Sequence, residues 1–199
     1  MSHHIYNTTG LVIDSTPTGE GSGMYSVFTR ELGMVRARAQ GVRLQKSKLK
    51  PALQDFSVSE LSLVRGREIW RIVNARSDHN LYQHFRGRQE AVLMLGRVFF
   101  IVRRLVAGEE KNEPLFDLLD RSFHFAREND LSPEQSRSFE YILVLKILDN
   151  LGYRGRDSRL ERFANEPITI ELITAMSDSP GLKNHAAAAI NAALRESHL

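Results

Sequence analysis

The stretch Val35-Arg36-Ala37-Arg38-Ala39-Gln40 decides the fold of the first part of the chain. Small apolar residues stand at every second position, and the residues between them are polar or charged. A β-strand places alternate side chains on opposite faces, whereas an α-helix repeats about every 3.6 residues. We therefore predict a strand over residues 35–40, with its apolar side chains in a core and its arginines in solvent.

Short apolar runs lie on both sides of this stretch, and turn-rich segments separate them. The predicted strands are 10–14, 24–29, 35–40, 56–63 and 68–75, with a loop over 16–23 and a long basic connection over 41–51. Within 56–63 the apolar positions shift from Phe56 and Val58 to Leu61 and Leu63, which indicates a β-bulge that bends the strand. Five short strands with glycine at the bends predict a small OB-type barrel.

After Arg76 the pattern becomes helical. The predicted helices cover 89–106, 114–127 and 169–176, a further one from Ser132 to Gly152, and a last one that starts at Ser179-Pro180. The polar residues of 89–106 concentrate on one narrow stripe, so we expect it to be the central helix of a bundle. The predicted fold class is α+β: an N-terminal five-stranded OB-fold β-barrel over residues 1–77, followed by an all-α helical domain over residues 78–199.

The charge of the chain is unevenly distributed. The whole chain carries a net charge of +3, but residues 30–76 hold eleven basic and four acidic residues, a net charge of +7. Residues 36–50 hold six basic residues and no acidic one. Such a strand and loop are typical of a phosphate-binding surface, with an ordinary solvated face as the alternative. The candidate DNA-binding residues are Arg30, Arg36, Arg38, Arg43, Lys46, Lys48, Lys50, Arg67 and Arg71.

Aromatic residues matter if unpaired bases stack on the barrel. We expect Phe28 and Phe56 to lie in the core. Tyr25 and Trp70 are the two candidates for exposed stacking platforms, and burial is the alternative that we favour for them.

The sequence offers no recognisable catalytic or metal-binding motif. It has no cysteine, which excludes thiolate chemistry and cysteine-based zinc sites and favours a reducing compartment. The glycine-rich residues 19–23 lack the lysine and the following helix of a P-loop. We therefore expect a protein that is not an enzyme, with no catalytic residue, no metal and no cofactor. We also expect a cytoplasmic location without membrane attachment, since arginines interrupt the most apolar stretch, 91–107.

Six motifs follow one another with characteristic gaps: TGLVI (9–13), FTRELG (28–33), VRARAQGVR (35–43), KSKL (46–49), ALQDFS (52–57) and ELSL (60–63). As an ordered set they resemble the N-terminal half of the bacterial recombination mediator RecO. The motif LGY at 151–153 also lies where that family has a helix with a similar end. Many family members carry a four-cysteine zinc module after this point. Residues 154–163 stand there instead, so the chain resembles a short form without the zinc site.

The resemblance implies an N-terminal OB fold, a helical domain, and binding of single- and double-stranded DNA. It also implies annealing of complementary strands in the RecF pathway of DNA-damage repair, without nucleotide hydrolysis. The implied partners are RecR and the single-strand-binding protein, with which the family loads recombinase onto coated DNA. The implied location is the bacterial cytoplasm, in association with the nucleoid.

Two other functions stay open. The first is a generic OB-fold RNA-binding protein, because phosphate contacts carry little information about the sugar. The second is an adaptor whose helical domain binds an acidic-hydrophobic protein tail. Its candidate residues are Arg88, Arg97, Arg103 and Arg104, for which pairing with local acids such as Glu90 is the alternative.

Overall fold

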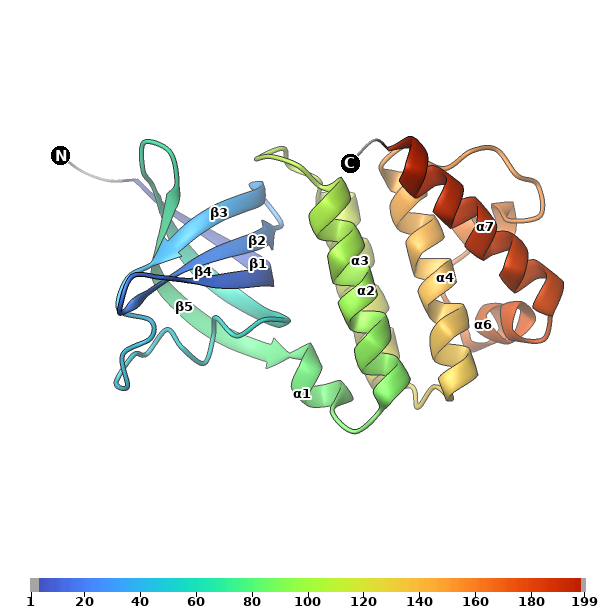
Figure 1. The fold of residues 1–199 in the computed structure, drawn as a ribbon, viewed down its shortest axis with the longest axis horizontal. Helices are drawn as coiled ribbons and strands as arrows, with labels where there is room; N and C mark the ends of the chain where they lie inside the picture. The colour runs from blue at the N-terminus through green and yellow to red at the C-terminus, as the bar shows by residue number, and fades with distance from the viewer. Residues whose placement is uncertain (1–3, 198–199) are drawn as a thin grey trace. The chain divides into compact units, whose positions relative to one another are not determined.

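The structure is a computed structural model that describes residues 4–197 (Figure 1). It divides into two compact units. The first contains the chain up to His84 together with Val106–Phe116, and the second contains Phe85–Leu105 and the chain from Asp117 onward. The boundary predicted after residue 77 lies inside the last strand, and the first unit extends past it. We call residues 106–116 the strap, because they rejoin the first unit after a long helix of the second.

The first unit is a closed five-stranded barrel, so the predicted fold class is confirmed. Its strands are β1 (Ile5–Thr18), β2 (Ser22–Thr29), β3 (Gly33–Ala39), β4 (Ser57–Arg65) and β5 (Trp70–Asn80). They close in the order β1-β2-β3-β5-β4, and only the pairing of β3 with β5 is parallel. The register between β4 and β5 shifts after Val58 and after Ser62, which confirms the predicted bulge.

The first strand is much longer than the predicted 10–14. Residues 5–11 of β1 pair with β4, and residues 10–18 pair with β2. The first half of β1 is therefore hydrogen-bonded to one neighbouring strand and the second half to the other. Backbone pairing rather than burial defines its ends, where several side chains are exposed. Alternation of apolar residues therefore could not reveal them.

Residues from all five strands fill the barrel, including Val12 of β1. Val35, Ala37 and Ala39 are fully buried, as the opening stretch predicts. Trp70 and Tyr25 are also buried, with 2% and 6% of their surfaces exposed, so the hypothesis that they form stacking platforms is wrong. Burial raises the pKa of the Tyr25 hydroxyl, and the nearby Asp55 carboxylate adds to the effect.

The remaining elements are helices. They are α1 (Leu81–Phe85), α2 (Gln89–Leu105), α3 (Glu113–Glu128), α4 (Pro133–Asn150), α5 (Glu161–Asn165), α6 (Ile170–Ser177) and α7 (Pro180–Glu196). Ser132 caps α4: its hydroxyl accepts a hydrogen bond from the Gln135 backbone N–H at 3.2 Å, and the Gln135 side chain accepts one from the Ser132 N–H. Within the described residues, no helix is long and apolar enough to cross a membrane.

The central helix of the second unit is α4, not α2 as predicted. α4 contacts α2, α5, α6 and α7, and its buried residues lie on all sides. Even Lys146 is buried there, with its ammonium group donating to the carbonyls of Ala164 and Glu166, and burial lowers its pKa. α2 instead exposes Leu93 and Phe100. These residues are four before and three after Arg97, so they share its face of the helix.

Gly33 supplies the first test of this fold. Its φ is +71°, and a Cβ atom there would lie 2.2 Å from the Glu110 carbonyl oxygen of the strap. We expect Gly33→Ala to lower the free energy of unfolding by about 2–4 kcal/mol, because left-handed strain adds to displacement of the strap. Urea denaturation monitored by fluorescence of the single tryptophan would measure this loss.

Gly19→Ala is the matched control in the same unit. Gly19 also has a positive φ, +60°, but apart from its chain neighbours no described atom lies within 4 Å of the position that an alanine methyl group would take there. It should therefore lose only the backbone strain, about 1 kcal/mol. Equal losses in the two variants would show that the strap does not press on Gly33.

Candidate nucleic-acid interface

The outer face of β3 carries the arginines of the opening stretch. Arg36 and Arg38 are exposed, and each lies between buried residues of the same strand. In the β3–β5 register Arg38 is the partner of Arg71, which is exposed as well. The pairing therefore places these three arginines, which we call the arginine face, on one side of the barrel wall.

The arginine face is electrostatically unfavourable for an isolated chain. Like charges on neighbouring strands destabilise a sheet. Arg38 donates to the Ser22 hydroxyl at 3.4 Å, but among the described residues none of the three arginines forms an ion pair with a carboxylate. A polyanion across this face would relieve the repulsion, because each phosphate can neutralise one guanidinium.

The basic connection after β3 is folded into successive turns rather than extended as a loose loop. Val42 and Leu53 belong to the barrel core, and Leu49 packs against it. The Arg43 backbone N–H donates to the Gly21 carbonyl at 3.0 Å, which fixes the connection to the turn between β1 and β2. The basic side chains of the connection, Arg43, Lys46, Lys48 and Lys50, are exposed.

Two of the predicted DNA-binding residues lie apart from this group. Arg30 is in the turn between β2 and β3, at the opposite end of β3 from the basic connection. Arg67 is exposed in the turn between β4 and β5, and no described contact joins it to the arginine face. The structure therefore brings together the arginine face and the basic connection, but not every candidate.

Arg65, which is not among the predicted DNA-binding residues, lies in a cluster of polar contacts. Arg65 ends β4, and its Nη1 donates to Glu109 of the strap at 2.6 Å. Its guanidinium carbon lies 5.1 Å from the centroid of the Trp70 ring. The partner in this cluster is 44 residues away in the chain, so no local motif could reveal it.

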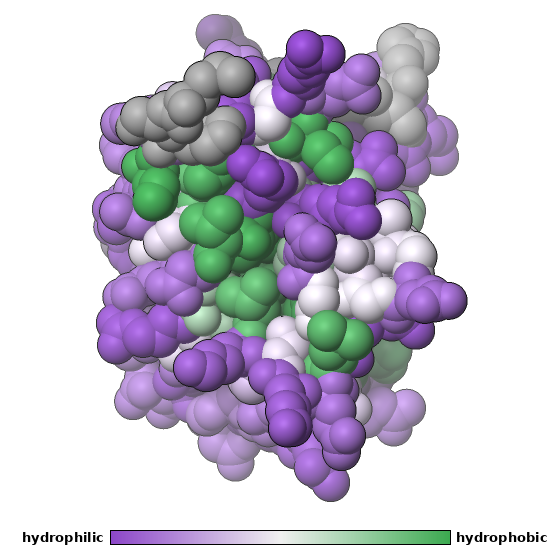
Figure 2. All heavy atoms as spheres, turned by 90° about the vertical axis from the view of Figure 1, so that its left-hand side faces the viewer, coloured by the Kyte–Doolittle hydropathy of each residue, from purple (hydrophilic) through white to green (hydrophobic). Residues whose placement is uncertain are grey.

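Apolar side chains are exposed on the barrel too. Ile5, Leu44 and Val73 have about half or more of their surface in solvent. Figure 2 shows a face of the molecule on which hydrophilic side chains surround a hydrophobic area. The barrel therefore offers apolar contacts as well as charged ones.

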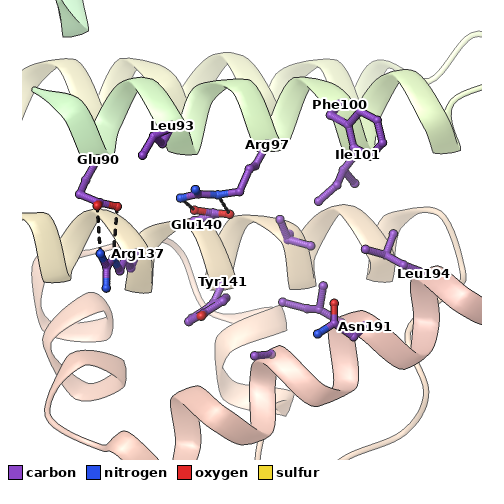
Figure 3. Close-up of a pocket in the computed structure, with 13 residues that line it drawn as sticks. Glu90, Leu93, Arg97, Phe100, Ile101, Arg137, Glu140, Tyr141, Asn191 and Leu194 are labelled. Atoms are coloured by element: carbon purple, nitrogen blue, oxygen red, sulfur yellow. Dashed lines mark hydrogen bonds and ion pairs between the residues drawn. The ribbon is translucent and has the colours of Figure 1, made fainter.

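The second unit contains a groove of about 650 Å³ between α2, α4 and α7 (Figure 3). Its apolar lining includes the exposed Leu93 and Phe100. Arg97 crosses the groove and donates to both carboxylate oxygens of Glu140 at 2.6 Å, and this hydrogen bonding raises the pKa of Arg97. Arg137 forms the corresponding pair with Glu90 and lowers the pKa of that carboxyl.

The four arginines predicted to bind a partner peptide do not converge on this groove. Only Arg97 lines it. Arg88 pairs with Asp130 at 3.2 Å and lies over the Phe85 ring, and Arg103 and Arg104 are exposed in the last turn of α2. Residues 4–197 also contain no group of three or more histidine, aspartate or glutamate side chains that could hold a metal ion.

The comparison with known proteins agrees with this architecture. Residues 1–79 match the family model described as "Recombination protein O N terminal". The DNA repair protein RecO of Alkaliphilus metalliredigens is 27% identical over 151 residues, which cover 75% of this chain and 59% of that protein. The DNA repair protein RecO of Gloeobacter violaceus is 35% identical over 122 residues, 60% of this chain and 45% of that protein.

A third relative, the DNA repair protein RecO of Acaryochloris marina, is 42% identical over 72 residues, 36% of this chain. The chain thus spans between a quarter and about three fifths of the length of these three relatives. The family model covers the barrel as far as residue 79, within β5, and the Alkaliphilus match is about twice as long. The chain is therefore similar to the RecO family, most clearly over residues 1–79.

Proposed function

We propose that the chain binds single- and double-stranded DNA through the arginine face and the basic connection, and that it acts in DNA repair by annealing complementary strands. The observation that carries this proposal is the register of β3 and β5, which sets Arg38 beside Arg71 with no carboxylate paired to either among the described residues. The name of the relatives, DNA repair protein, supports the same function.

Annealing by this surface needs binding energy alone. A basic face that holds two strands screens their mutual repulsion and raises their local concentration. Contacts to phosphates do not depend on base sequence, so the strands can slide until they are in register. We therefore propose a mediator without enzymatic activity of its own.

Two complementary fluorescent oligonucleotides at low magnesium test this proposal. We expect the protein to accelerate their pairing, equally with and without ATP. Slower pairing would indicate a passive single-strand binder, and acceleration that requires ATP would indicate a nucleotide-driven enzyme. Binding of labelled DNA and RNA of one sequence over a salt series should accompany this assay, because tighter binding of RNA would favour the RNA-binding alternative.

The partners are also part of the proposal. RecR, the single-strand-binding protein and recombinase loading follow from the family resemblance. The groove of the second unit is the place where we propose that a protein tail binds, since Leu93 and Phe100 are exposed there beside the ion pairs Arg97–Glu140 and Arg137–Glu90. This adaptor role adds to DNA binding and does not replace it, because a purely structural barrel leaves the arginine face unexplained.

A further inference from the structure

The strap presents one carboxylate to two groups of the barrel. Glu109 Oε2 accepts a hydrogen bond from Arg65 Nη1 at 2.6 Å, and Glu109 Oε1 accepts one from the Trp70 indole at 2.9 Å. Close by, the Met34 N–H donates to the Gly108 carbonyl at 3.0 Å, which attaches the strap to β3. Arg65, Trp70 and Glu109 therefore form a single polar cluster on the first unit.

The ion pair in this cluster is open to solvent. The side chain of Arg65 is 61% exposed and that of Glu109 is 36% exposed. Exposed ion pairs stabilise a protein little, so a competing anion can replace the carboxylate. A phosphate is a suitable competitor, because the planar guanidinium donates to phosphate and carboxylate oxygens in the same forked geometry.

The position of Arg65 also suits nucleic acid. It directly precedes the turn between β4 and β5, which carries the exposed Arg67. OB barrels bind oligonucleotides with this turn and with the turn between β1 and β2. In this chain the latter turn is bonded to the basic connection through Gly21 and Arg43.

We propose that Arg65 is a phosphate-binding position that Glu109 covers in the chain without DNA, and that a DNA phosphate displaces this carboxylate on binding. The inference rests on the proposed DNA-binding function and adds a residue and a control element to it. The strap then lowers the affinity of the barrel for DNA until the exchange takes place. Trp70 reports the exchange, because its indole loses a charged acceptor when Glu109 leaves Arg65.

Glu109→Gln tests the proposal with little structural disturbance. The glutamine carbonyl can still accept the indole hydrogen bond, but the negative charge on Arg65 is gone. We expect the variant to bind a single-stranded oligonucleotide roughly threefold more tightly, with a log–log salt slope steeper by about 0.7. Adding Arg65→Gln to this variant should remove the gain.

Glu113→Gln is the matched control. Glu113 lies on the same strap and carries the same charge, but it pairs with Lys111 at 3.1 Å. The affinity of the Glu113→Gln variant for the oligonucleotide should stay close to that of the wild type, because solvent screens a surface charge that lies away from the bound strand. In the wild type, saturating DNA should also change the emission of Trp70, the single tryptophan of the chain.

The outcomes distinguish failure of this inference from failure of the proposed DNA-binding function. Equal gains from Glu109→Gln and Glu113→Gln would overturn the inference, and so would a gain that survives Arg65→Gln or an emission that DNA leaves unchanged. In each of these cases the wild type still binds DNA and the proposed function stands. Absence of DNA binding by the wild type would overturn the proposed function and the inference together.

Discussion

Replacing Arg36, Arg38 and Arg71 together with glutamine should weaken binding of single-stranded DNA roughly a hundredfold at about 50 mM salt. Each phosphate contact on a single strand contributes about −0.7 to the log–log salt slope, so the slope should flatten by about two units. The expectation follows from the common face on which β3 and β5 hold these residues. Fluorescence anisotropy of a labelled oligonucleotide over a salt series measures both quantities.

A variant with the same loss of charge elsewhere is the control. Arg121, Arg159 and Arg162 are exposed arginines of the second unit, each paired with a nearby carboxylate. Their joint replacement by glutamine should change the slope little. Replacement of Lys46, Lys48 and Lys50 should flatten it by about two to three units. If only this lysine variant had an effect, the arginine face would be an ordinary solvated strand face.

Phe139→Ala should lower the free energy of unfolding of the helical unit by about 3–5 kcal/mol. Phe139 is fully buried on α4, and its ring stacks on that of Phe125 with centroids 6.3 Å apart. α4 is the helix against which four others pack, so the cavity cannot be closed by moving one neighbour. Urea denaturation followed by far-ultraviolet circular dichroism would measure the change.

Phe100→Ala removes the same side chain from an exposed position. With 62% of its surface in solvent, Phe100 should contribute less than about 0.5 kcal/mol to stability. The variant therefore also tests the groove without unfolding it: loss of binding of an acidic-hydrophobic peptide by Phe100→Ala would support the proposed tail site. A loss of stability similar to that of Phe139→Ala would mean that α2 packs differently from the structure.

The sequence predicted those parts of the fold that burial encodes locally. The alternation of β3, the bulge of β4 and the start of a helix at Ser132 are each visible within about ten residues, and each is confirmed. The ends of β1 were not predictable in this way, because pairing with β2 and β4 rather than apolar residues holds them. The short helices α1 and α5, five residues each, are too brief to show a helical period.

For the candidate DNA-binding site, the sequence predicts which residues are basic but not how they are arranged in space. The sequence identifies the basic residues, but it cannot show that Arg38 lies beside Arg71. That relation depends on the parallel pairing of β3 with β5. For the same reason the choice of α2 as central helix was wrong: its apolar residues are partly exposed in a groove, which a helical pattern alone does not distinguish from burial.

The strap has a consequence for how the chain folds during synthesis. Domains tend to fold as their residues leave the ribosome, beginning at the N-terminus. Here the last strand of the barrel ends at Asn80, but Glu109, which accepts the Trp70 indole hydrogen bond, is added only after α2 has been made. The nascent barrel therefore completes its polar contacts late, and at the ribosome it passes through a stage in which Arg65 and the Met34 N–H still face water.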